Sequence, residues 1–188
     1  RFCTIYRSES GVQETLTRYH DDFLNTLARL EGKHEWGIKI YCDRETLAQK
    51  VGEISDKVTE LKAEIATKSS GMAYFLKKRL EQTIVEEMER VSDECAQGSH
   101  DRLSSNAEEA VINPLQNKEI TGRQGTMILN GAYLVAERQL TAFRAELAGL
   151  EKAYNDLGFS YEMTGPWPPY NFVAIGVGES VTDDSANG

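Results

Sequence analysis

Residues 34–42 read HEWGIKIYC, and this alternation of apolar and polar side chains points to a sheet. Trp36, Ile38 and Ile40 fall on one face of the stretch, and Glu35 and Lys39 fall on the other. An alternation with a period of two residues predicts a strand that buries one face and exposes the other.

The segments before this strand predict another strand and a helix. Residues 1–7 (RFCTIYR) are rich in β-branched and aromatic side chains, which is typical of a strand. Apolar side chains that recur at steps of three and four predict an amphipathic helix over residues 12–31. Gly32 is well placed to end this helix, because glycine adopts the left-handed cap conformation without steric cost.

The last third of the chain repeats this order of elements. Residues 126–135 (TMILNGAYLV) predict a central strand, and a helix over residues 137–157 is closed by Gly158. Two strand–helix–strand units predict an α+β, ferredoxin-like sandwich with both helices on one face of the sheet. Its four-stranded antiparallel sheet is expected to comprise residues 1–7, 35–42, 126–135 and 159–164.

The segment between the two units predicts an inserted helical hairpin over residues 45–96. A second apolar stripe runs from Leu76 to Cys95, and the intervening TKSSG is typical of a turn. The first stripe alternates by four and three, as in a coiled coil, and we expect it to be shielded from solvent. Its members are Leu47, Val51, Ile54, Val58, Leu61 and Ile65. Residues 106–110 are expected to add a helical turn.

These patterns divide the chain into four parts. Residues 1–44 and 113–175 form the two halves of one domain, and residues 45–112 form the insertion. Residues 176–188 (GVGESVTDDSANG) are predicted to be a flexible acidic tail, because they contain too little apolar surface to bury. The chain begins with Arg1, and we interpret it as a piece of a longer protein.

Composition argues against several classes of partner and cofactor. A net charge of −9 opposes binding to nucleic acid or to anionic lipid, and no segment has the ~20 apolar residues that cross a membrane. Cys3, Cys42 and Cys95 show no metal-binding spacing and indicate a reducing, cytoplasmic location. The phosphate-binding, dinucleotide and HExxH patterns are also absent, so we predict no catalytic residue, metal or cofactor.

Two surfaces are candidates for binding a partner. Residues 165–173 (GPWPPYNFV) form a stiff, proline-rich arm that carries Trp167, Tyr170 and Phe172. These aromatic side chains either contact a partner or plug the protein's own core, which is the commoner fate of large aromatics. The basic cluster Lys77, Lys78 and Arg79 either docks an acidic partner or is an ordinary solvated helix face.

Four segments in order resemble the GvpL/GvpF family of gas vesicle proteins: RFCTIYRS, EWGIKIY, NPLQNKEITGRQGTMILNGAYLV and GPWPPYNFV. The resemblance covers about residues 1–173, and members usually carry another small α/β domain before this region. It implies a part in gas vesicle formation through contact with the small hydrophobic shell protein and other accessory proteins. The family has no established catalytic motif to carry over.

The expected function is therefore that of a non-enzymatic assembly protein, either a minor structural component of gas vesicles or a chaperone-like scaffold. The alternative is a ferredoxin-like RNA-binding module, since that sandwich also binds RNA. Neither TMILNGAYLV nor RFCTIYR has the aromatic and basic pattern that such modules carry on their central strands. A small-molecule enzyme is a third possibility, but the sequence shows no recognisable set of acid, base and nucleophile.

Overall fold

The computed structural model describes residues 5–117, 119 and 122–173 of the 188-residue chain. Packing divides the chain into two units. The larger unit is Lys33–Asn171, and the smaller unit combines Arg1–Gly32 with Phe172–Gly188.

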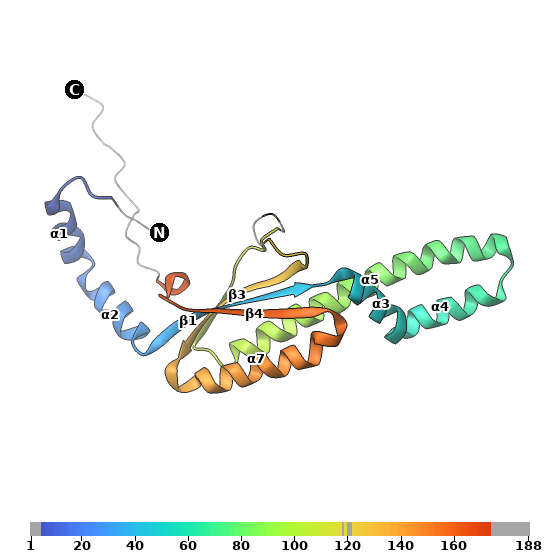
Figure 1. The fold of residues 1–188 in the computed structure, drawn as a ribbon. Coiled ribbons are helices and arrows are strands. Elements are labelled where there is room, and N and C mark those ends of the chain that lie inside the picture. The colour runs from blue at the N-terminus through green and yellow to red at the C-terminus, as the bar shows by residue number, and fades with distance from the viewer. Residues whose placement is uncertain (1–4, 118, 120–121, 174–188) are drawn as a thin grey trace, which may run out of the picture. The chain divides into compact units, whose positions relative to one another are not determined.

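The larger unit is built on a four-stranded antiparallel sheet (Figure 1). The strand order is β2-β3-β1-β4, so β3 and β1 are central. The strands are β1 (Lys33–Cys42), β2 (Glu109–Ile112), β3 (Thr126–Ala136) and β4 (Phe159–Trp167). The strands predicted at residues 35–42, 126–135 and 159–164 are confirmed, and β4 continues through residues 165–167, which were predicted to begin the proline-rich arm.

Strand β1 buries the face that its alternation predicted. Trp36, Ile38 and Ile40 all belong to the core. On the opposite face Lys39 is partly exposed, as expected for a polar position. Glu35 differs, because it is only 5 % exposed although it lies on the same polar face.

Four helices complete the larger unit's core, and α5 and α7 contact the sheet (Figure 1). The helices are α3 (Arg44–Ile54), α4 (Asp56–Thr67), α5 (Ser70–Ser104) and α7 (Leu140–Tyr154). All four contribute buried side chains to the core, including Leu47, Val58, Cys95 and Phe143. The helix predicted at residues 137–157 corresponds to α7 with a 3₁₀ turn at each end, and Gly158 follows it at a φ of 88°.

The predicted helical hairpin is present, with one break in its first arm. Helices α4 and α5 pack against each other and are joined by Lys68 and Ser69. Five of the six residues of the first stripe are buried or partly buried, but Ile54 is 57 % exposed. The break at Ser55 explains this exposure: α3 ends there, and the Ser55 hydroxyl accepts the Val58 N–H to begin α4.

A charged cluster also ties the two arms of the hairpin together. Lys57 of α4 donates to the Glu87 carboxylate of α5 at 2.7 Å, and Arg90 Nη2 donates to the same carboxylate at 3.0 Å. The hydrogen bond from Lys57 and, to a smaller extent, those from Arg90 lower the pKa of Glu87 below its ordinary value of 4.5.

The prediction of a strand at residues 1–7 is wrong for residues 5–7, the part of it that the structure describes. Residues 1–4 lie outside the described residues, and residues 5–7 form no strand. The sheet instead gains β2, which begins inside the expected helical turn and pairs with β3. Four residues are too few for periodicity to reveal a strand. The α+β class is confirmed, but the ferredoxin-like assignment, which used residues 1–7 as its first strand, is not.

The described part of the smaller unit contains two helices where one was predicted. They are α1 (Glu9–Arg18) and α2 (His20–Leu30), interrupted at Tyr19, and neither has a buried residue. The prediction that residues 12–31 share one face of the sheet with residues 137–157 is not confirmed. In the described residues the larger unit's core includes side chains of α5 and none of α1 or α2. An apolar stripe predicts that a helix packs, but not what it packs against.

The four-part division at residues 44, 112 and 175 stays a prediction. The acidic tail at residues 176–188 lies outside the described residues.

Candidate interaction surfaces

The proline-rich arm is held at its end by the buried carboxylate of Glu35. Oε2 of Glu35 accepts the backbone N–H of Asn171 at 2.9 Å, and Oε1 accepts the side-chain amide of Asn171 at 2.6 Å. Hydrogen bonds to an ionised acceptor are stronger than those between neutral groups. Glu35 therefore compensates its own burial by fixing a segment 136 residues away in sequence.

Gly165 allows the arm to pass close to β1. Its φ is 121°, a conformation that side-chain-bearing residues rarely adopt. A Cβ atom at Gly165 would lie 2.9 Å from the backbone oxygen of Glu35. The approach of the two backbones thus requires glycine at this position.

The three aromatic residues of the arm have different surroundings. Trp167 and Tyr170 are 50 % and 51 % exposed, whereas Phe172 is buried. The Trp167 indole N–H donates to Thr164 Oγ1 at 3.2 Å, which holds the half-exposed ring in place. Of the three, only Phe172 has the burial that the plug interpretation expects, and contact with a partner stays a prediction for all of them.

A second surface lies at the end of the helical hairpin. Lys77, Lys78 and Arg79 are exposed there, and in the described part of the chain none of them forms an ion pair. Beside them Tyr74 and Phe75 are 69 % and 70 % exposed, with their rings in edge contact at 5.7 Å between centroids. We call residues 72–79, which begin with the exposed Met72, the tip.

The exposed aromatic residues of the tip were missed by the sequence analysis. A usable signal was present, because Tyr74 and Phe75 follow the turn and lie off the apolar stripe that starts at Leu76. On a helix with 3.6 residues per turn, side chains off that stripe face away from the partner helix.

A third surface is an apolar groove in the smaller unit, with a volume of about 520 Å³. Its apolar lining is Leu16, Phe23, Leu24, Leu27, Leu30 and Val173. We call this surface the α2 groove. Leu27, one of the residues that line the groove, is 67 % exposed.

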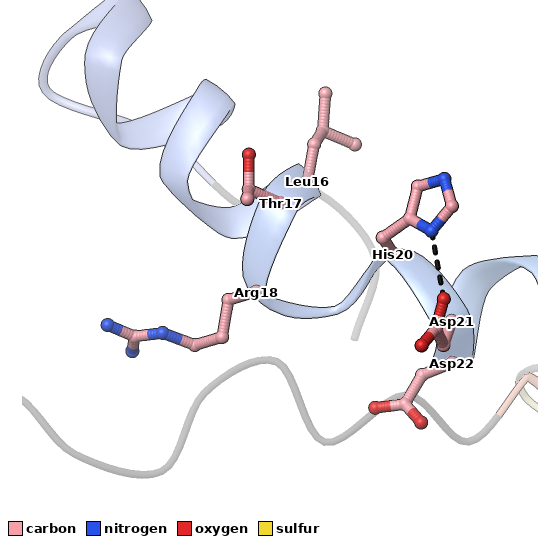
Figure 2. Close-up of a pocket in the computed structure, with 6 residues that line it drawn as sticks. All are labelled: Leu16, Thr17, Arg18, His20, Asp21 and Asp22. Atoms are coloured by element: carbon pink, nitrogen blue, oxygen red, sulfur yellow. Dashed lines mark hydrogen bonds and ion pairs between the residues drawn. The ribbon is translucent and has the colours of Figure 1, made fainter.

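A second pocket adjoins the α2 groove and is lined by Leu16, Thr17, Arg18, His20, Asp21 and Asp22 (Figure 2). Leu16 and His20 also line the α2 groove. Figure 2 shows the carboxylates of Asp21 and Asp22 at the start of α2, with His20 joined to Asp21 by a hydrogen bond of 3.0 Å. The apolar wall of the α2 groove therefore lies next to a pocket lined by two carboxylates and one guanidinium group.

The thiols of Cys42 and Cys95 are poorly suited to act as nucleophiles. Cys42 and Cys95 are buried, and burial raises the pKa of each thiol above its ordinary value. Cys3 lies outside the described residues. Over residues 5–117, 119 and 122–173, no group of three or more His, Cys, Asp or Glu side chains is placed to hold a metal ion. None of the described helices is long and apolar enough to cross a membrane.

Comparison with known proteins gives one consistent family. The model of the family described as "Gas vesicle synthesis protein GvpL/GvpF" matches residues 1–174. "Gas vesicle protein L" of Streptomyces sp. (strain CB03234) is 32 % identical over 176 residues, which cover 93 % of this chain and 61 % of that protein. The protein of the same name from Haloferax mediterranei is 24 % identical over 183 residues, or 92 % of this chain and 54 % of the relative. The chain thus spans less than two thirds of either relative.

Two solved structures share the fold. The gas vesicle protein GvpF from Anabaena sp. PCC7120 matches with a TM-score of 0.67 and 18 % identity, covering 93 % of this chain and 68 % of that one. GvpF from Microcystis aeruginosa matches with a TM-score of 0.60 and 20 % identity, covering 93 % and 69 %.

Proposed function

Because the chain belongs to the GvpL/GvpF family of gas vesicle proteins, we propose that it is a non-enzymatic component of gas vesicle assembly. In this proposal it acts as a minor structural component or chaperone-like scaffold, in the cytoplasm and associated with gas vesicles. It binds the small hydrophobic shell protein and other accessory gas vesicle proteins.

The observation that supports this proposal best is the half-exposed pair Trp167 and Tyr170 on an arm anchored by Glu35. Aromatic side chains that are held rigidly outside the core lose little conformational entropy when a partner binds. Tryptophan and tyrosine are also the residues that most often dominate binding energy at protein interfaces. We propose that Trp167, Tyr170 and Phe172 belong to the partner-binding surface, in which the half-exposed Trp167 and Tyr170 contact the partner first.

Lys77, Lys78 and Arg79 form a second contact region in this proposal. Their charge is opposite to that of the chain as a whole, which is −9. Such a local cluster favours encounter with acidic surfaces more than it adds affinity. The same net charge opposes the RNA-binding alternative, and no observation on the described residues favours it.

The test is binding of purified shell protein to this chain and to its Trp167→Ala variant, with thermal melting measured on the same samples. We expect the variant to keep its melting temperature and to bind roughly 30-fold more weakly, the loss typical of an interface anchor. Ile54→Ala is the matched control, since Ile54 is an apolar residue of similar exposure, 57 % against 50 % for Trp167. Unchanged affinity in the Trp167 variant, or equal losses in both variants, would remove the arm from the binding surface.

A further inference from the structure

The tip carries more exposed apolar surface than the hairpin needs. Met72, Tyr74 and Phe75 are all more than half exposed and lie within four residues of one another. The contacts between α4 and α5 use a different stripe, in which Leu76 and Leu80 are partly buried. The exposed side chains therefore add nothing to hairpin packing, and a cluster of this kind marks an interaction site.

The α2 groove has the matching shape. It is concave, its wall is apolar, and its volume of about 520 Å³ lies within the range typical of ligand pockets. Helix α2 has 11 residues and no buried side chain. A helix this short is marginal in water without a packing partner. Covering the α2 groove would therefore stabilise the helix that forms it.

The charges of the two surfaces are complementary. The tip places Lys77 and Lys78 next to its aromatic residues, and neither lysine forms an ion pair within the described part of the chain. The pocket that adjoins the α2 groove is lined by Asp21 and Asp22, together with one cation, Arg18. Opposite charges beside an apolar contact steer two surfaces together and fix their register.

We propose that the tip of one copy of this chain docks into the α2 groove of a second copy. In this contact Tyr74 and Phe75 enter the groove, and Lys77 and Lys78 lie near Asp21 and Asp22. A second copy fits better than an unrelated partner, because both complementary surfaces are present on every molecule in equal number. The proposal does not depend on binding to the shell protein, and its test uses this chain alone.

The contact joins two different surfaces, so it is heterologous. After one contact, each pair still has one free tip and one free groove, so association continues into open chains or closes into a ring. A heterologous contact can therefore be recognised by mixing variants, which is not possible in the same way for a symmetric dimer. A copy without a working tip and a copy without a working groove can still form one contact together, and they must then stop at a pair.

The experiment is sedimentation velocity over roughly 10–500 µM, the range suited to a small interface. We expect the unmodified chain to sediment faster as its concentration rises. The tip variant Tyr74→Gln/Phe75→Gln and the groove variant Leu24→Gln/Leu27→Gln should each weaken association by roughly 30-fold or more. Both changes affect exposed side chains and keep a good helix former, so thermal melting should be unchanged.

Mixing the two variants in equal amounts decides the question. We expect a species of twice the monomer mass that does not grow further with concentration. Val85→Gln/Ile54→Gln, which changes two exposed apolar residues outside both surfaces, is the control and should associate like the unmodified chain. The proposal is overturned by an unmodified chain that stays monomeric, by variants that associate normally, or by a mixture that remains monomeric.

Discussion

Replacing Glu35 by glutamine should release the proline-rich arm without unfolding the protein. In the structure both carboxylate oxygens accept a hydrogen bond from Asn171, at 2.9 and 2.6 Å. Glutamine keeps one acceptor oxygen, but it turns an NH₂ group toward the second donor. The change removes one charge-assisted hydrogen bond and weakens the other, which corresponds to about 2 kcal/mol of arm stability.

The assay must detect local opening, because a detached arm can satisfy its donors with water. We expect hydrogen exchange at the Asn171 amide to accelerate by roughly 30-fold, the factor that corresponds to this free energy. Acrylamide quenching gives a second readout, because the chain has two tryptophans and Trp36 is buried. Quenching of Trp167, which is already half exposed, should increase in the variant.

Two comparisons make the result interpretable. Glu60→Gln removes an exposed carboxylate from α4 and should change neither readout. A double-mutant cycle of Glu35→Gln with Asn171→Ala should give a coupling of about 1–3 kcal/mol, because the two side chains contact each other. If exchange at Asn171 is unchanged in Glu35→Gln, or if the two substitutions are additive, Glu35 does not anchor the arm.

Two further predictions concern the backbone of the arm and the charges of the hairpin. Gly165→Ala should destabilise the protein by about 1–3 kcal/mol in urea unfolding, because the added Cβ would meet the Glu35 backbone and the residue has a positive φ. Gly71→Ala is the control, because the space around Gly71 is open, and it should be neutral or slightly stabilising. Glu87 has a lowered pKa in the folded state, so its contribution to stability is present above its unfolded pKa of about 4.5 and is lost as the pH falls through the folded value. Glu87→Gln should therefore lose less stability than the unmodified chain between pH 6 and pH 3, and parallel losses would contradict this assignment.

The sequence by itself determined the elements with strong local periodicity. The alternation of β1, the apolar run of β3 and the three- and four-residue steps of α7 each specify one element and its buried face. Gly158 could be placed as a helix end for the same reason, since a left-handed residue after an apolar stripe is a local requirement. The hairpin followed from two such stripes and a turn. The exposure of Ile54 came from a serine cap that interrupts the first stripe, and the second arm continues to Ser104, past its predicted end at residue 96.

The candidate surfaces were only partly readable from the sequence. The prolines predicted a stiff arm, and its aromatic residues were identified, but the exposure of Trp167 and the burial of Phe172 could not be separated. Both are large apolar side chains in the same nine residues. The aromatic residues of the tip carried a local signal, since they lie off the stripe that packs on α4.

Tertiary structure alone decided which distant segments meet. Alternation placed Glu35 on the polar face of β1, and only the return of the chain 136 residues later buries it against Asn171. Likewise β2 is a strand because β3 offers it an edge, and α5 contributes core side chains beneath the sheet of the larger unit. Local periodicity records which side of an element is apolar. The partner of that side depends on contacts between residues far apart in the chain, and these leave no periodic trace in a single sequence.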